Sequence, residues 1–201
     1  MRYIQKGQEP ESFTQWKALE NQDWHPTYDD LKNPEKGDVH QALLAEQGGL
    51  CCYCEGEIAL TDSHIEHLLS QEFHEEEALN FNNMLCSCGL SHKGQSMPDH
   101  CGNAKGNKEL PITPLMPDCG NHFLFSSDGK ISPSKESDAA AIETIKILHL
   151  DCDELTERRK YAIDALMNDD GVDDWDTYAR NFIGDGNVEY ISCLLAVMGK
   201  R

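Results

Sequence analysis

The chain has 201 residues, of which 39% are hydrophobic, and a formal net charge of −19 at pH 7. This length and apolar content suffice for one domain with a real core and exclude a disordered chain. No run approaches the roughly 18 apolar residues of a membrane helix, and the opening residues lack the apolar stretch of a signal peptide, so we expect a cytoplasmic protein with no membrane segment.

The first segment, residues 1–49, is predicted to be helical. Residues 12–24 predict a helix with Ser12 as its N-cap. Residues 25–37 contain two prolines and a glycine and predict a loop. Residues 38–47 predict a second helix, which Gly48 and Gly49 are expected to end.

The second segment, residues 50–110, is rich in Cys and His and contains short strand-like pieces. Residues 58–60 and 65–69 are expected to pair as a hairpin. Nine cysteines in a reducing compartment favour metal binding over disulfides.

The third segment, residues 111–201, is expected to begin with a hairpin and to continue as helices. Residues 123–125 and 130–131 flank a Ser-Ser-Asp-Gly turn, which is typical of a hairpin. From Asp138 onward, two apolar stripes predict helices: the first has Ile142, Ile145, Leu148 and Leu150, and the second has Leu155, Ala162, Leu166 and Met167. Residues 187–198 predict a third, largely apolar helix, buried in the core or, as the second alternative, against another chain.

The cysteines predict one structural zinc site. Cys51 and Cys54 form a C-x-x-C pair, which can hold Zn²⁺ from a tight turn. We expect Cys88 and Cys101 to complete the site, with Cys86 as the competitor for the third place. Four thiolates leave no open position, so this zinc would stabilise the fold and do no chemistry. The three cysteines that follow residues 50–110 are expected to be small core residues: Cys119, Cys152 and Cys193.

Between and after these cysteines lie the groups that phosphodiester hydrolysis needs. A histidine can deprotonate water near neutral pH, oxygen ligands can hold Mg²⁺ or Mn²⁺, and a lysine can hold a phosphate. Side chains alternate along a strand, so Glu66 and His67 would lie on opposite faces of the sheet unless the strand ends there. The inventory comprises His67, Glu66, Asn83, Asn103, Asn107, Lys105 and Lys108.

The order of these motifs resembles the HNH endonuclease family. C-x-x-C is followed by I-E-H at 65–67, N-N-M-L at 82–85 and C-G-N-A-K-G-N at 101–107. More narrowly, the chain is similar to the PtuB-like HNH proteins of Septu-type and retron-associated anti-phage defence. The similarity extends to the MRYI start and the L-x-L-[ND] turn at 148–151.

The resemblance implies an α+β fold in which a zinc-stapled ββα-metal core, residues 50–110, is wrapped by the N- and C-terminal helices. It implies that His67 is the general base, that Glu66 can bind the catalytic cation, and that Asn83 orients the base or the metal loop. The third HNH position usually follows the last cysteine directly, and Gly102 stands there. The third residue, which would also help to hold the cation, stays open between Asn103 and Asn107.

The resemblance also implies a metal-dependent endonuclease acting on nucleic acid, with DNA as the first candidate. Its implied partner is an ABC-type ATPase, in some systems joined by a retron reverse transcriptase and its RNA–DNA product. We expect the contact to involve residues 138–201.

Charge opposes direct nucleic-acid binding. In residues 51–110, three lysines face ten acidic residues, whereas nucleic-acid binders carry a basic footprint. Either a partner supplies the basic surface, or the chain is a non-catalytic zinc-binding module that binds another protein. Two zinc-hydrolase patterns fail, because Ala78 replaces the second His of H-E-x-x-H and no P-C-x-x-C follows the H-x-E of residues 64–66.

Overall fold

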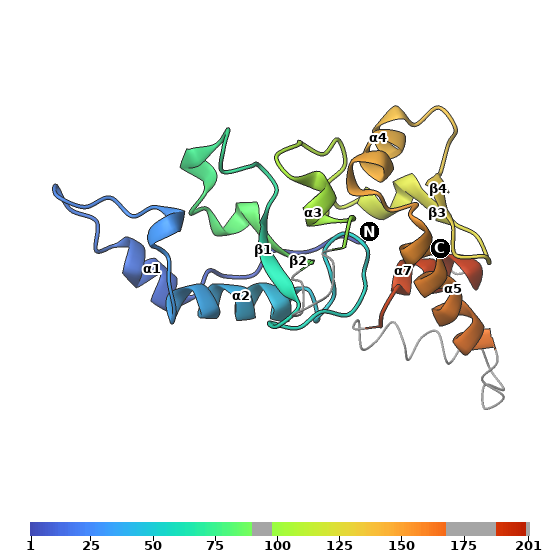
Figure 1. Cartoon of the computed structure of the whole chain (residues 1–201), viewed down its shortest axis with the longest axis horizontal. Helices are drawn as coiled ribbons and strands as arrows, with labels where there is room; N and C mark the ends of the chain where they lie inside the picture. The colour runs from blue at the N-terminus through green and yellow to red at the C-terminus, as the bar shows by residue number, and fades with distance from the viewer. Residues whose placement is uncertain (90–97, 168–187, 200–201) are drawn as a thin grey trace.

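A computed structural model describes residues 1–89, 98–167 and 188–199 of the chain. Its helices and two small antiparallel sheets form an α+β fold, as predicted (Figure 1). The strands are β1 (Ser63–His67), β2 (Met84–Cys88), β3 (Phe123–Phe125) and β4 (Ile131–Pro133). The α-helices are α1 (Glu11–Lys17), α2 (Glu35–Glu46), α3 (Gly102–Lys105), α4 (Ala139–Leu148), α5 (Asp153–Met167) and α7 (Ile191–Val197).

Helix α1 is shorter than the predicted helix of residues 12–24. Ser12 lies inside it and donates a 2.6 Å hydrogen bond to Asp38 instead of capping it. The helix ends because Asn21 imposes a turn: its side chain accepts from the backbone N–H of Asp23 and donates to the carbonyl of Leu19.

Helix α2 confirms the helix predicted at 38–47 but begins three residues earlier, at Glu35. Gly48 and Gly49 follow it with positive φ angles of 66° and 72°, the conformation that ends a helix and suits glycine. The helix buries Val39 and Leu43 and packs against β1 and β2. The preceding loop contains a short 3₁₀ helix, Tyr28–Asp30.

The hairpin predicted between residues 58–60 and 65–69 is wrong. β1 pairs instead with β2, in a register that places Ser63 opposite Cys88 and His67 opposite Met84. Residues 59–62 form a turn because the carboxylate of Asp62 accepts from the backbone N–H of Ala59. This local bond removes the segment from strand pairing.

The second predicted hairpin is confirmed as β3 and β4, in which Phe125 lies opposite Ile131. Helices α4 and α5 follow as expected, although two residues of the predicted apolar stripes point outward. Ile142 is 45% exposed and Met167 is 60% exposed. The helix predicted at 187–198 is present as α7, while its predicted first residue lies outside the described residues.

The main hydrophobic core draws on all three sequence segments, from Met1 and Phe13 through Met84 and Leu85 to Leu148 and Leu155. A smaller cluster joins α5 to α7. In Figure 1, β1 and β2 lie between α2 and α3, with α5 and α7 at the opposite end from α1. Among the described residues, the helices are too short or too polar to cross a bilayer.

Gly129, in the turn between β3 and β4, fixes the approach of this hairpin to α5. Its φ is +83°, and an added Cβ would clash with the carbonyl oxygen of Thr156 and lie 2.8 Å from the backbone nitrogen of Lys160. We expect Gly129→Ala to lower the free energy of unfolding by about 2–4 kcal/mol, because left-handed strain and overpacking each cost about 1–3 kcal/mol. Denaturant titration measures this loss.

Gly106→Ala is the matched control for Gly129→Ala. Gly106 also has a positive φ, +53°, but an added Cβ there meets nothing within 4 Å. Only the backbone strain should appear. Equal losses in the two variants would contradict the argument that contact with α5 makes Gly129 necessary.

Candidate functional site

Four cysteines from three parts of the chain converge in the interior. Cys51 and Cys54 lie in a tight turn where the backbone N–H of Cys51 donates to the carbonyl of Gly56 and that of Glu55 donates to Cys51. Cys88 ends β2, and Cys101 directly precedes α3. Their sulfur atoms all lie within 4.8 Å of one another, so this buried group could hold a metal ion such as zinc.

The surroundings of these sulfurs suit a cation. The backbone N–H groups of Cys88 and Gly56 donate to the sulfurs of Cys51 and Cys54, each at 3.4 Å. Burial alone raises the pKa of Cys51, but hydrogen bonds from the neighbouring cysteines outweigh it and lower that pKa. Burial and the same neighbours raise the pKa of Cys101.

Cys86, the competitor for the third place, is not part of this group. Its sulfur lies 3.6 Å from the hydroxyl of Ser63. Of the two cysteines on β2, it is therefore Cys88 whose sulfur lies with those of Cys51, Cys54 and Cys101. His100 is buried beside the cluster, with Nδ1 3.2 Å from the sulfur of Cys101.

Glu66 and His67 lie at the opposite end of the β1–β2 ladder from Cys88. β1 ends at His67, so the alternation of a continuing strand does not separate the two side chains. Both line a small cavity of about 190 Å³, together with Ser70, Gly102 and Asn107. The structure therefore brings a carboxylate, an imidazole, a hydroxyl and an amide to one place.

Glu66 is held as a carboxylate whose two oxygens have different neighbours. Oε1 accepts a 3.1 Å hydrogen bond from the hydroxyl of Tyr53 and lies 3.1 Å from Nζ of Lys105. Oε2 lies 3.3 Å from Nε2 of His64. Burial alone raises the pKa of Glu66, but the bond from His64 and the charge of Lys105 outweigh it and lower that pKa. Glu66 is therefore negatively charged at neutral pH.

His67 is arranged as a neutral imidazole. Its Nε2 lies 3.0 Å from the carbonyl oxygen of Ala78, which can only accept, so Nε2 carries the proton. Nδ1 is then the basic nitrogen, and the side-chain amide of Gln71 lies 3.1 Å from it. Burial lowers the pKa of His67 below its ordinary value, although the bond to Ala78 opposes the change. Tyr28 packs edge-on against the ring, with centroids 4.6 Å apart.

Asn83 fixes the loop that follows β1. It is 5% exposed, and its Oδ1 accepts from the backbone N–H of Leu69 at 2.8 Å. Its amide donates to the carbonyls of Leu69 and Glu77 at 3.0 and 3.1 Å. Because this loop carries Ser70 and Gln71, Asn83 positions two cavity residues without lining the cavity itself.

The two asparagines left open by the sequence lie in different surroundings. Asn103 donates its amide to the carbonyls of Gly89 and Pro98, at 3.1 and 3.0 Å. Asn107 lines the cavity with Glu66 and His67 and donates to the carboxylate of Glu72. Of the two, only Asn107 is among the residues that line this cavity.

The two lysines proposed as phosphate ligands also differ. Lys105 is buried, with its side chain 1% exposed, and its ammonium donates to the carbonyl of His67 at 2.8 Å besides contacting Glu66. Lys108 is exposed. In this conformation Lys105 joins α3 to the end of β1, whereas Lys108 is accessible from solvent.

Several cavity residues were not singled out from the sequence. Ser70 is 5% exposed, and its hydroxyl has no hydrogen-bond partner among the described residues. Gln71 and Tyr53 contact His67 and Glu66. These contacts depend on how the loop after β1 and the 51–54 turn fold, which no motif records. The segment 91–97, which includes His92 and Lys93, lies outside the described residues.

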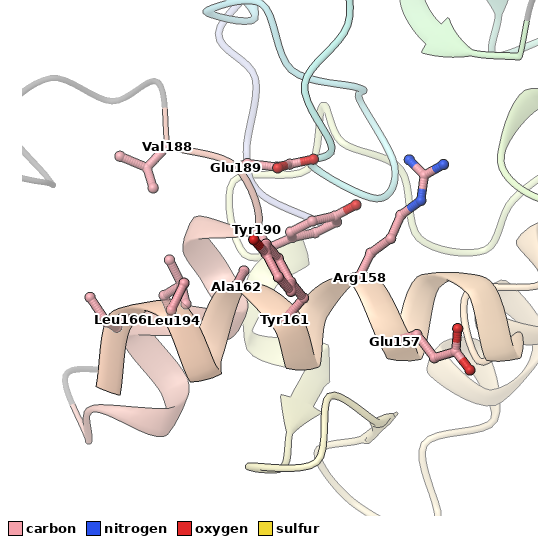
Figure 2. Close-up of a pocket in the computed structure, with 10 residues that line it drawn as sticks. Glu157, Arg158, Tyr161, Ala162, Leu166, Val188, Glu189, Tyr190 and Leu194 are labelled. Atoms are coloured by element: carbon pink, nitrogen blue, oxygen red, sulfur yellow. The ribbon is translucent and has the colours of Figure 1, made fainter. Parts of the chain in front are cut away.

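A larger hollow of about 810 Å³ lies between α5 and α7 (Figure 2). Figure 2 shows Ala162, Leu166 and Leu194 at one part of it, with Arg158 and Glu189 at another. Tyr161 on its wall is 77% exposed. None of the predicted catalytic or metal-binding residues lines this hollow.

No protein-family model matches the chain. The chain is similar to "Retron Vc95 putative HNH endonuclease" of Vibrio cholerae serotype O1 biovar El Tor, at 26% identity over 76% of this chain and 78% of that protein. It is also similar to "Retron Ec83 putative HNH endonuclease" of Escherichia coli, at 26% identity over 80% of this chain and 78% of that protein. Both of these proteins are named as retron HNH endonucleases, and each is 26% identical to the chain.

Proposed function

We propose that the chain is a metal-dependent HNH endonuclease that hydrolyses phosphodiester bonds of nucleic acid, with DNA as the first candidate. The observation that carries the proposal is the convergence of Glu66, His67, Ser70 and Asn107 on one small cavity. The antiparallel pair β1–β2, followed by α3, supports a ββα-metal core within residues 50–110.

In this proposal the four clustered cysteines hold a structural zinc ion. Zinc joins the 51–54 turn to the end of β2 and the start of α3, so it fixes α3, which carries Gly102 of the cavity, and the strand that pairs with β1. The assignment of Cys51, Cys54, Cys88 and Cys101 rests on their sulfur geometry.

His67 acts as the general base in this mechanism. Its neutral ring presents Nδ1, where the amide of Gln71 now lies at 3.1 Å. A water molecule that takes the place of this amide can give its proton to Nδ1 and attack phosphorus. The carbonyl of Ala78 then stabilises the resulting imidazolium through Nε2.

Glu66 and Asn107 supply oxygen ligands for a catalytic Mg²⁺ or Mn²⁺, and Asn103 is the less favoured third residue. When bound, such a cation neutralises charge on the phosphate and on the leaving oxygen. The hydroxyl of Ser70 lines the same cavity and has no hydrogen-bond partner among the described residues. It can therefore donate to a phosphate or a water molecule bound there.

The two lysines take different roles in the proposal. Lys108 remains a candidate phosphate contact because it is exposed. Lys105 positions Glu66 and the end of β1 through its buried ammonium.

The acidic rim of the cavity favours a partner that delivers the substrate. Glu72 bonds to Asn107 at the rim, and Glu75–Glu77 follow on the same loop. Repulsion of phosphate by these groups weakens direct binding. The proposed partner is an ABC-type ATPase, with a retron reverse transcriptase and its RNA–DNA product, bound through residues 138–201. The apolar hollow between α5 and α7 is a described surface that supports such a contact.

The test is cleavage of supercoiled plasmid, single-stranded DNA and structured RNA by zinc-loaded protein. We expect cutting with Mn²⁺ or Mg²⁺ and none when the cation is omitted and zinc is retained. Each reaction is run with and without the ATPase and the reverse transcriptase complex. We expect the complex to raise the rate, because it supplies the basic surface that the chain lacks.

Absence of cleavage under every combination, with zinc bound and the complex assembled, would favour the alternative function. That alternative is a non-catalytic zinc-binding interaction module. The exposed Tyr161 and the apolar hollow around it are the observations in its favour.

A further inference from the structure

His64 and Glu66 meet against the start of α3, where Gly102 has no side chain. They lie two residues apart on β1, so both side chains project from the same face of the strand. His64 Nε2 lies 3.3 Å from Glu66 Oε2. Gly102 opens α3 directly opposite, and a Cβ built on it would lie 2.5 Å from Glu66 Oε2 and 2.7 Å from His64 Nε2.

The missing side chain is a requirement of this arrangement. Gly102 is helical and has no positive φ, so its backbone would accept any L-residue. A side chain at this position is excluded because Glu66 Oε2 and His64 Nε2, both from β1, lie too close to where its Cβ would stand. The imidazole from β1 thus occupies the space that a donor side chain from the start of α3 would otherwise fill.

The charges at this point suit a cation. Glu66 Oε1 is engaged by Tyr53 and Lys105, whereas Oε2 lies beside His64 and Gly102. Glu66 and Gly102 line the small cavity, and His64 stands next to them. The His64 side chain is 25% exposed, so its ring can be reached from solvent. The buried hydroxyl of Ser70, which has no partner among the described residues, borders the same cavity.

We propose that His64 Nε2 is a ligand of the catalytic cation, which it holds together with Glu66 Oε2 in front of Gly102. The inference rests on the proposed nuclease function, because it assigns a ligand of that same site. A nitrogen donor favours Mn²⁺, Co²⁺ or Ni²⁺ over Mg²⁺, which prefers oxygen donors. We therefore expect the site to bind Mn²⁺ more tightly than Mg²⁺.

Pulsed electron paramagnetic resonance of Mn²⁺ bound to the zinc-loaded protein tests this assignment without any cleavage reaction. We expect the wild type to show coupling of Mn²⁺ to a directly bound imidazole nitrogen. His64→Ala should lose the coupling and bind Mn²⁺ at least about 10-fold more weakly, the scale of losses at metal-site residues. His74→Ala, which alters an exposed histidine outside the cavity, should change neither quantity.

Two further variants keep the test decisive if His64→Ala folds poorly. His64→Asp replaces the nitrogen donor with oxygen, so it should lose the coupling and shift the preference towards Mg²⁺. His64→Gln keeps a side chain that can hydrogen bond to Glu66 but has no imidazole nitrogen, so it should fold like the wild type and lose the coupling. Coupling that persists in His64→Ala, or is absent from the wild type while Mn²⁺ binds normally, would show that His64 only hydrogen bonds to Glu66.

The two proposals fail in distinguishable ways. Nitrogen coupling from His64 in a protein that cuts no nucleic acid would retain the metal site and remove the nuclease function. Metal-dependent cleavage without that coupling would retain the nuclease and remove His64 from the ligand set.

Discussion

Replacing His67 with alanine is expected to lower the cleavage rate by about 10²- to 10⁴-fold, the usual contribution of a general base. His67 is the residue at the end of β1 whose basic nitrogen borders the cavity, and its Nε2 proton is already committed to the carbonyl of Ala78. No other histidine lines this cavity. The measurement is the single-turnover rate on the best substrate, at saturating Mn²⁺.

The control separates loss of the base from loss of structure. His74→Ala removes a histidine of the same segment whose partners are the exposed residues Glu76 and Glu109, so its rate should match the wild type. Zinc content and the unfolding midpoint of His67→Ala must stay close to wild-type values for the comparison to hold. Added imidazole should partly restore cleavage in His67→Ala, because the deletion leaves room beside a cavity of about 190 Å³. A rate within 10-fold of the wild type would remove His67 from the role of base.

Loss of one zinc ligand is expected to have the largest effect on stability. Cys88→Ser should reduce bound zinc from about one ion per chain to almost none and destabilise the protein by several kcal/mol, because structural zinc sites have binding free energies of about 10–16 kcal/mol. The measurements are metal content after dialysis and the unfolding midpoint. Cleavage should fall as well, since the cysteine cluster positions β2 and α3.

Cys86→Ser is the matched control, two residues away on the same strand. Its sulfur contacts Ser63 and takes no part in the cysteine cluster. This variant should keep its zinc and lose only a small part of its stability. If Cys86→Ser lost zinc and Cys88→Ser kept it, the ligand assignment from sulfur geometry would be wrong.

Local features of the chain were predictable because their causes are local. The helix at 38–47 and the hairpin of β3 and β4 follow from periodicity, paired glycines and a short turn, and both are present. The helix predicted at 12–24 ends early because the side chain of Asn21 accepts a hydrogen bond from the nearby backbone N–H of Asp23. This local bond competes with helix formation, and the spacing of apolar residues does not reveal it. The 58–60 strand failed for the same reason, through Asp62.

The candidate site was predictable in composition but not in arrangement. The motif order pointed to Glu66, His67 and Asn83, and the cysteine spacing pointed to Cys51 and Cys54. The structure groups Cys88, rather than Cys86, with the clustered sulfurs. It buries Lys105 against Glu66, which a pattern naming lysine as a phosphate ligand could not foresee.

The sequence by itself determined which chemical groups the protein carries and the order in which the chain presents them. The tertiary structure decided which groups meet, because β1 pairs with a strand from residues 84–88 and α3 folds back across both Glu66 and His64. These contacts join residues that lie 14 to 38 positions apart, as in the bonds of Asn83 to Leu69 and of Lys105 to His67. Distances across the fold, set by packing of the whole core, are not encoded in the spacing of any single motif.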